Sequence, residues 1–365
     1  PQLYLSAIFD LSAQRKQMIQ SNINAGIQKL GGYQIANGGF AYWNGQNYAD
    51  DWSTSYVGHF LIEAEKKGYS LPINFKSKWI SYQKSAAKDW RYNQSTNDFA
   101  QAYRLYTLAL AGSPDMASMN RLRETPGLSN ESKLRLAAAY ALAGQKQAAQ
   151  SLFSRSKLDE NNPRAYYYYG STQRNQAMAL ETLILLGDKQ RSFQMANQLA
   201  KKMSSDEWMS TQTTAYCLYA MSKFAQQNGG KGVDVTYAIN GKSLAISTTK
   251  AMANRSLEIK NGGNSITLKN TKGNTLYVRV LTSGILPIGQ EKAMQSKFFT
   301  NLVFKDRGGA VVNVSKIAQG TEFIAEITIR NQTNERVENV ALTQIIPSGF
   351  EIVNTRFTDF GSFGN

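Results

Sequence analysis

The sequence is short of the residues that most often carry chemistry in proteins. Among 365 residues there are one cysteine, Cys217, and one histidine, His59. A single cysteine excludes an internal disulfide and a cysteine-rich metal site, and a single histidine excludes a multi-histidine site. Few side chains are left for acid–base catalysis near neutral pH, and neither a metal nor another cofactor is expected.

Long apolar runs and clustered charges are also missing. The longest apolar runs, such as 183–186, are short and flanked by polar residues, so no transmembrane helix is predicted. The formal net charge is +15, but basic residues are scattered singly among acidic ones along the whole chain. Nucleic-acid binders more often concentrate positive charge in a stripe or tail, so no nucleic-acid partner is expected.

Up to about Asn228 the sequence contains a repeated helical pattern. Apolar segments begin with Ser, Thr, Asn or Asp as a helix N-cap, and four of the five end on glycine. Amphipathic stretches alternate with them, which predicts buried inner helices covered by outer ones. Because the connections are irregular and several are long, a closed α/α toroid is favoured over an open solenoid. The inner segments are 51–68, 97–112, 129–144, 171–187 and 209–224, and the outer ones are 74–85, 114–124, 145–154 and 188–204.

From Gly232 the apolar period changes to two, which predicts an all-β half with turns such as Asn240-Gly241. The segment 283–297 has Gly and Pro but little alternation, and it is predicted to separate two small β-domains. The chain begins and ends in mid-pattern, so it is expected to be cut from a longer protein. The predicted strand runs are 233–239, 242–248, 256–260, 265–269, 275–282, 298–304, 310–317, 321–329 and 337–346.

Several segments together resemble the bacterial alpha-2-macroglobulin family, over nearly the whole chain and in the family's order. The helical half resembles the thioester domain, an α/α toroid. Residues 319–354 resemble the opening of a macroglobulin-like domain, and the residues between resemble the C-terminal part of a CUB-like β-domain. The segments that carry the helical resemblance are NGGFAYWNG (37–45), DDWSTSYVGHFLIEAEKKGY (50–69), QAYRLYTLALAG (101–112), KLRLAAAYALAG (133–144), STQRNQAMALETLILLG (171–187) and WMSTQTTAYCLYAMSKFA (208–225).

The resemblance implies a multidomain fold of all-α plus all-β type. An α/α toroid at 1–228, lacking its N-terminal thioester helix, is expected to be followed by two small β-sandwich domains. These are the C-terminal part of the CUB-like domain at 229–290 and the N-terminal part of the macroglobulin-like domain at 291–365, which is truncated. The macroglobulin-like piece is expected to pack on the toroid within the same protein.

In this family a thioester joins the cysteine and the glutamine of a Cys-x-x-Gln motif. Cys217 is followed three residues later by Ala220, so Cys217 is not the thioester cysteine and is interpreted as a buried small hydrophobe. Relatives follow the motif with Pro-x-Leu-x-Leu, which Pro1, Leu3 and Leu5 match. The resemblance therefore implies that the motif lies upstream of Pro1, and no catalytic residue is expected within the chain.

Several polar residues could be interpreted as catalytic, but each also has a simpler structural interpretation. His59 lies on an apolar helix and is expected to be structural. Complement-type relatives use a histidine that would fall in segment 88–98, which contains none; amines are therefore the expected acceptors of a thioester acyl group. Asp50 and Asp51 are interpreted as a helix N-cap with favourable dipole charge.

The acidic and aromatic residues give two further expectations. A glycan-active toroid needs two carboxylates across a cleft, whereas Glu63, Glu181 and Glu207 look scattered and no pair is expected. Aromatic residues at loops or helix starts are candidates for covering a thioester face or docking a neighbouring domain, and simple loop packing is the open alternative. These candidates are Trp43, Trp52, Trp90, Tyr166 and Tyr167.

For function, the resemblance implies part of a broad-spectrum endopeptidase inhibitor that traps proteases after bait cleavage and is not an enzyme. Target proteases are the implied partners, and a cell-wall synthesis protein is a further one. The alternatives are a non-thioester paralogue serving as a cell-envelope scaffold or binding module, and a toroidal enzyme acting on isoprenoids or glycans. The implied location is the periplasm or cell envelope, with any membrane association through a lipid anchor outside this chain.

Overall fold

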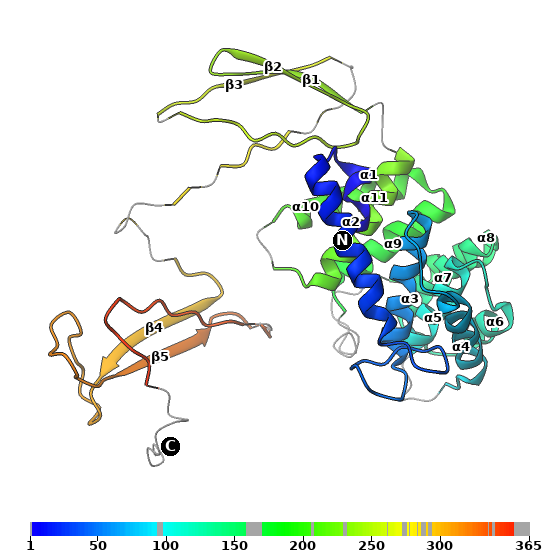
Figure 1. The fold of residues 1–365 in the computed structure, drawn as a ribbon, viewed down its shortest axis with the longest axis horizontal. Coiled ribbons are helices and arrows are strands. Elements are labelled where there is room, and N and C mark those ends of the chain that lie inside the picture. The colour runs from blue at the N-terminus through cyan, green and yellow to red at the C-terminus, as the bar shows by residue number, and fades with distance from the viewer. Residues whose placement is uncertain are drawn as a thin grey trace. The chain divides into compact units, whose positions relative to one another are not determined.

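The computed structural model of the chain combines helices and sheets in two compact units, Pro1–Val278 and Arg279–Asn365 (Figure 1). The first contains the helices and strands β1–β3, and the second contains β4 and β5. The residues described are 2–92, 98–157, 170–205, 208–228, 232–260, 262–271, 276, 278–282, 284–285, 290, 294–334, 336–337 and 340–353.

Helices form at all the predicted inner and outer segments, with boundaries shifted by only a few residues. The 3₁₀ turn η1 (Gln2–Tyr4) and the short α1 (Leu5–Ile8) precede them. The inner helices are α3 (Asp51–Lys66), α5 (Asp98–Leu110), α7 (Asn130–Leu142), α9 (Thr172–Leu186) and α11 (Thr211–Asn228). The outer helices are α4 (Phe75–Asp89), α6 (Met116–Glu124), α8 (Lys146–Ser154) and α10 (Lys189–Met203), and α2 (Ala13–Gly31) precedes the first pair.

The helix ends follow the predicted capping chemistry. The side chain of Asp50 accepts a hydrogen bond from the Ser53 backbone N–H at 2.7 Å, which satisfies one unpaired donor of the first turn of α3. In a second helix, α9, the C-cap residue Gly187 has φ of 78°, a left-handed conformation that a residue without a Cβ adopts at little cost. These caps fix where each helix stops and the next connection begins.

The alternation of inner and outer helices is confirmed by burial. Every residue of α5 is buried, whereas α10 buries only Ser192, Ala196 and Leu199. The inner helices pack as a series, α3 on α5, α5 on α7, α7 on α9 and α9 on α11. Side chains of the first and last inner helices, α3 and α11, are also in contact. The ring centres of His59 and Tyr219 lie 5.1 Å apart.

The strands form two antiparallel groups. Strands β1 (Val233–Ile239), β2 (Lys242–Thr248) and β3 (Ile266–Asn270) have the order β2-β1-β3. Asn240 and Gly241 connect β1 to β2 with φ of 49° and 84°, the two positive values that a tight hairpin turn requires. Strands β4 (Phe298–Lys305) and β5 (Ile324–Asn331) pair with each other.

Several predicted strand runs are not strands among the described residues. An alternating pattern specifies two faces, but a strand also needs a hydrogen-bonded neighbour. In the described part of the chain these runs form no ladder, and run 310–317 forms only an isolated bridge, Val311 with Lys305. The strand predictions that are wrong on this point are 256–260, the described part of 275–282, 310–317 and the described part of 337–346.

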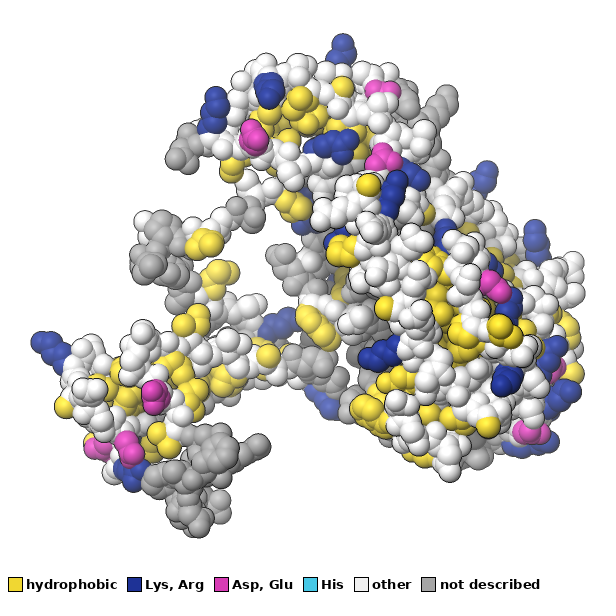
Figure 2. Space-filling model, in the orientation of Figure 1, with side chains coloured by type: hydrophobic (Ala, Val, Ile, Leu, Met, Phe, Trp, Pro, Cys, Tyr) yellow, Lys and Arg dark blue, Asp and Glu magenta, His cyan; other side chains and the backbone are white. Residues whose placement is uncertain are grey.

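The described helices include none with both the length and the apolarity that crossing a membrane requires. On the face that Figure 2 shows, Lys and Arg side chains are spread over the surface, some beside Asp or Glu, and do not gather in one stripe. This distribution matches the scattered positive charge expected from the sequence.

Candidate functional site

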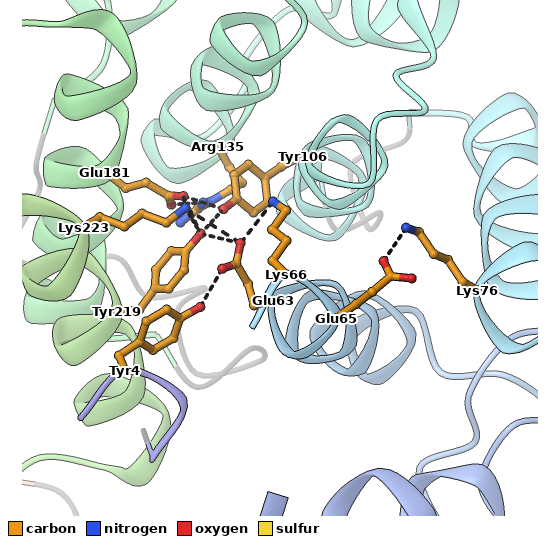
Figure 3. A network of polar contacts seen from close by, with 10 residues as sticks. All are labelled: Tyr4, Glu63, Glu65, Lys66, Lys76, Tyr106, Arg135, Glu181, Tyr219 and Lys223. Atoms are coloured by element: carbon orange, nitrogen blue, oxygen red, sulfur yellow. Dashed lines mark hydrogen bonds and ion pairs between the residues drawn. The ribbon is translucent and has the colours of Figure 1, made fainter. Parts of the chain in front are cut away.

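The inner helices share a buried cluster of charged and hydroxyl side chains. Each of the five contributes to it, and Tyr4 joins from the N-terminal 3₁₀ turn (Figure 3). The members, from α3 to α11, are Glu63, Tyr106, Arg135, Glu181, Tyr219 and Lys223, and we call them, with Tyr4, the central cluster.

Glu181 lies at the middle of the central cluster. One carboxylate oxygen accepts a hydrogen bond from Arg135 at 2.8 Å, and the other accepts one from the Tyr106 hydroxyl at 2.6 Å. The Tyr219 hydroxyl and the Lys223 ammonium lie 2.9 and 3.4 Å from that second oxygen. The Arg135 guanidinium also lies 4.2 Å from the centre of the Tyr106 ring, a cation–π distance.

Glu63 connects the cluster to the N-terminal turn. Its Oε2 accepts a hydrogen bond of 2.7 Å from the Tyr4 hydroxyl, and its Oε1 lies 3.4 Å from the Tyr219 hydroxyl. Lys66 and Lys223 place their ammonium groups 3.4 and 3.8 Å from the same Oε1. The two buried carboxylates are thus balanced by two basic side chains, Arg135 and Lys223, and by the more exposed Lys66.

Both carboxylates are held ionised. Burial raises the pKa of the Glu181 carboxyl, but Lys223 and Arg135 together outweigh burial and set its pKa well below the usual range. Burial likewise opposes ionisation of Glu63, and Lys223 and His59 lead the interactions that give it a lowered pKa. A glycosidase needs one acid whose pKa is raised. This pair lacks that feature and has the character of a structural ion cluster.

The meeting of Glu63 and Glu181 corrects the expectation that the acidic residues are scattered without a pair. The two are far apart in sequence, and periodicity assigns a residue only to a face of its own helix, so their convergence depends on how α3, α9 and α11 pack. Glu207, the third acid, lies outside the described residues.

A pocket opens beside the central cluster. Its volume is about 160 Å³, and its walls are mainly apolar and aromatic, with Glu63 and His59 as the polar groups. The residues that line it are Leu3, Tyr4, Tyr56, His59, Phe60, Glu63, Ala215, Tyr216 and Tyr219. Residues of η1 thus form one wall against α3 and α11.

His59 is a buried neutral side chain. Its Nδ1 lies 3.0 Å from the Tyr103 hydroxyl, and the rings of Tyr106 and Tyr219 meet it edge-on at 5.3 and 5.1 Å. Burial lowers the pKa of the imidazole to about 4, against the opposing influence of Glu63, so His59 carries no charge near neutral pH.

Cys217 lies in the environment expected of a small hydrophobe. It is fully buried in α11, its Sγ is 3.8 Å from the Gln173 carbonyl oxygen, and burial raises the pKa of the thiol to about 12. A thiol with so high a pKa is a poor nucleophile. In the described part of the chain, no group of three or more His, Cys, Asp or Glu side chains is placed to bind a metal ion.

The known proteins that are similar to this chain include bacterial alpha-2-macroglobulins. No family model matches the chain. The alpha-2-macroglobulin of Rickettsia conorii is 23% identical over 358 residues, which cover 94% of this chain and 18% of that protein. The alpha-2-macroglobulin of Escherichia coli K12 is 25% identical over 251 residues, which cover 63% of this chain and 15% of that protein. The chain therefore spans less than a fifth of the length of these relatives.

Solved structures agree. Native Escherichia coli alpha-2-macroglobulin, from domain MG7 to the C-terminus, matches with a TM-score of 0.58 at 17% identity, over 91% of this chain and 54% of that one. Salmonella alpha-2-macroglobulin reacted with methylamine matches with a TM-score of 0.57 at 17% identity, over 91% of this chain and 22% of that one. The chain resembles the bacterial alpha-2-macroglobulin family.

The structure describes three of the aromatic candidates of this alpha-2-macroglobulin-like chain, and they lie in different surroundings. Trp43 is 65% exposed in the loop between α2 and α3. Trp52 packs in the helical core with its ring 5.0 Å from that of Tyr103, and Trp90 follows α4 with its ring 6.1 Å from that of Tyr92. Tyr166 and Tyr167 lie outside the described residues. Their proposed docking role remains a prediction.

One signal in the sequence would have found the central cluster. Arg135 stands between Leu134 and Leu136, and Glu181 follows Leu180, so both charges lie inside apolar stretches of inner helices. Charged side chains are almost never fully buried unless they are paired. Charges embedded in the segments predicted to be innermost therefore indicate partners on the facing helices.

Proposed function

We propose that this chain is part of a bacterial alpha-2-macroglobulin that inhibits endopeptidases by trapping them, and that it is not an enzyme. The observation that carries the proposal is similarity to the Rickettsia conorii protein over 94% of the chain. Escherichia coli structures described as activated by porcine elastase and by trypsin also share the fold, with TM-scores of 0.52 and 0.50.

In the proposed mechanism, a protease first cuts a bait segment in another part of the full-length protein. The helical unit then moves, and a lysine amine of the protease attacks a thioester that lies upstream of Pro1. The amine nitrogen forms an amide bond with the glutamine-derived carbonyl, the carbon–sulfur bond breaks, and the cysteine leaves as a thiol. The protease stays tethered, and each inhibitor acts once.

The proposed architecture is an α/α toroid followed by two small β-sandwich domains, with the macroglobulin-like part packing on the toroid. The series of inner helices and the meeting of α3 with α11 support the ring. The bond from Tyr4 to Glu63 supports a fixed position for the N-terminal turn, next to which the thioester segment would lie. The proposed location is the periplasm or cell envelope.

The test is methylamine treatment of the full-length protein, with free thiols and intact mass followed together. The expected result is one new thiol and one methylamine adduct, both mapped to a peptide before Pro1. The matched control is Cys217→Ser, which removes the only cysteine of this chain and should leave the released thiol unchanged.

The absence of both adduct and thiol would overturn covalent capture and leave the scaffold alternative. A released thiol that disappears in Cys217→Ser would overturn the upstream position of the thioester, because this cysteine would then be the reactive one. A protease assay tests trapping itself: a trapped protease should lose activity on large protein substrates but keep it on small peptides.

A further inference from the structure

The loop between α2 and α3, drawn in blue in Figure 1, carries solvent-exposed aromatic side chains. Trp43 is 65% exposed, Tyr48 is 60% exposed and Tyr42 is 44% exposed. Large aromatic side chains usually bury most of their surface, as Trp79 does in the same unit with 1% exposed. Three neighbouring exposed rings therefore indicate a surface that contacts something else.

The same loop carries no charge. Between Lys29 and Asp50 no acidic or basic residue occurs, although 18% of the whole chain is charged. The exposed polar side chains beside the rings are amides instead. Asn44 and Asn47 are exposed, and neither side chain has a hydrogen-bond partner in the described part of the chain. An uncharged surface of rings and free amides complements a neutral, hydroxyl-rich ligand.

The rings are held in place before any ligand arrives. At the base of the loop, the Phe40 N–H donates to Thr54 Oγ1 at 2.9 Å, and Phe40 itself is fully buried. At the tip, the backbone N–H of Trp43 donates to Gln46 Oε1 at 3.0 Å, and Gln46 Nε2 donates to the Tyr48 hydroxyl at 2.6 Å. One glutamine thus connects the backbone of Trp43 to the ring hydroxyl of Tyr48, and the Trp43 ring itself packs edge-on against the Tyr42 ring at 5.1 Å. A surface ordered in this way loses little entropy on binding.

We propose that the surface formed by Tyr42, Trp43, Asn44, Asn47 and Tyr48 binds a neutral oligosaccharide. One face of a pyranose ring presents C–H groups whose slight positive charge meets the negative face of an aromatic ring. The sugar hydroxyls and the amides of Asn44 and Asn47 then exchange hydrogen bonds. Three rings on one short loop suit one or two sugar units, whereas a stable protein interface needs about 800 Å² on each partner. This inference does not depend on protease trapping.

The test uses saturation-transfer NMR and calorimetry on the full-length protein with chitotriose and maltotriose. Sorbitol is the control ligand, since it has the hydroxyls without the ring face. The expected dissociation constant is on the order of 1 mM for at least one trisaccharide, with saturation strongest on the axial ring protons. Sorbitol should give no saturation.

Variants assign any binding to this loop. Trp43→Ala and Tyr48→Ala should each weaken binding by about tenfold, and Trp43→Phe, which keeps a ring, should retain most of it. Trp208→Ala is the matched control, because Trp208 is 72% exposed but lies outside the loop. Circular dichroism of each variant confirms that the fold is kept. Failure of both trisaccharides to bind, or binding that survives both Trp43→Ala and Tyr48→Ala, would overturn the proposal.

Discussion

The helical part and the strands of this chain bury their apolar residues very differently. The main hydrophobic cluster contains residues of η1 and of the helices from α2 to α11. In β4 and β5, by contrast, no residue is fully buried, and Ile324 and Ile329 remain 38% and 41% exposed. In β1 the buried side chains are those of Val235, Tyr237 and Ile239.

The difference in burial follows from where helices and strands find partners for their backbone hydrogen bonds and their apolar faces. A helix completes its backbone hydrogen bonds internally, and its apolar stripe finds a partner on the next hairpin of the array. A strand needs a ladder partner on each side and a cover for its apolar face, and these come from distant segments. The central cluster belongs to the first kind of region, where five helices contribute to it and bury Arg135 and Glu181 almost completely.

The largest expected effect comes from breaking this cluster. Glu181→Gln leaves the fully buried Arg135 without its counter-charge and leaves the partly exposed Lys223 with Glu63 alone, which should cost on the order of 3–5 kcal/mol of unfolding free energy. Urea denaturation followed by circular dichroism at a helical wavelength measures it. The double variant Arg135→Met with Glu181→Leu should recover much of the loss. A cost below about 1 kcal/mol for Glu181→Gln would show that water reaches the cluster.

The pH dependence of stability probes the same interior. The folded pKa of His59 is about 4 and its ordinary value is 6.5, so between these values the unfolded chain binds the extra proton. Stability therefore falls as the pH drops through this window, by about 2 kcal/mol between about pH 7.5 and about pH 5. His59→Asn should show a correspondingly smaller difference.

NMR gives a direct check, because His59 is the only histidine of the chain. Its imidazole carbon-bound proton should keep the neutral chemical shift until the pH approaches 4. A midpoint near 6.5 would mean that the imidazole is hydrated and that this interior resembles the exposed strands.

A pair of glycines compares a packed site with an open one. A Cβ at Gly58 in α3 would lie 2.2 Å from a ring carbon of Trp79, whose indole N–H donates to the Thr54 carbonyl oxygen at 2.8 Å. Gly58→Ala should therefore cost about 1–3 kcal/mol through overpacking. A Cβ at Gly26 in α2 would meet nothing within 4 Å, so Gly26→Ala should stabilise the helix by about 0.5–1 kcal/mol. Thermal denaturation compares the two, and equal effects would contradict the packing.

The sequence predicts much of the helical part because its signals are local. The cap at Asp50, the terminal Gly187 and the spacing of apolar residues are each read within a few positions. The Asn240-Gly241 turn is local in the same sense, and it is confirmed. What fails is pairing at a distance. Run 310–317 alternates correctly, yet forms only an isolated bridge between Val311 and Lys305.

The candidate site was hard to predict for the same reason. Glu63 and Glu181 belong to helices far apart in the chain, and Tyr219 brings them together from a third helix. His59 and Cys217 are the single residues of their kinds, which makes them candidates for chemistry in the sequence. Both are buried, and burial accounts for their structural role. Composition indicates which residue types are scarce, but packing decides which of them meet.

The smallest effect is expected on the strands. Lys305 of β4 and Glu326 of β5 form an ion pair at 2.7 Å, with 30% and 52% of their side chains exposed. Water and salt already stabilise these charges, so Glu326→Gln should cost no more than about 1 kcal/mol, and added salt should reduce that cost further. Lys305→Met with Glu326→Gln isolates the pair energy by a double-mutant cycle, measured by denaturation of the same chain. If Glu326→Gln instead costs as much as Glu181→Gln, this hairpin is covered in the intact protein as thoroughly as the central cluster, and the contrast between helices and strands would disappear.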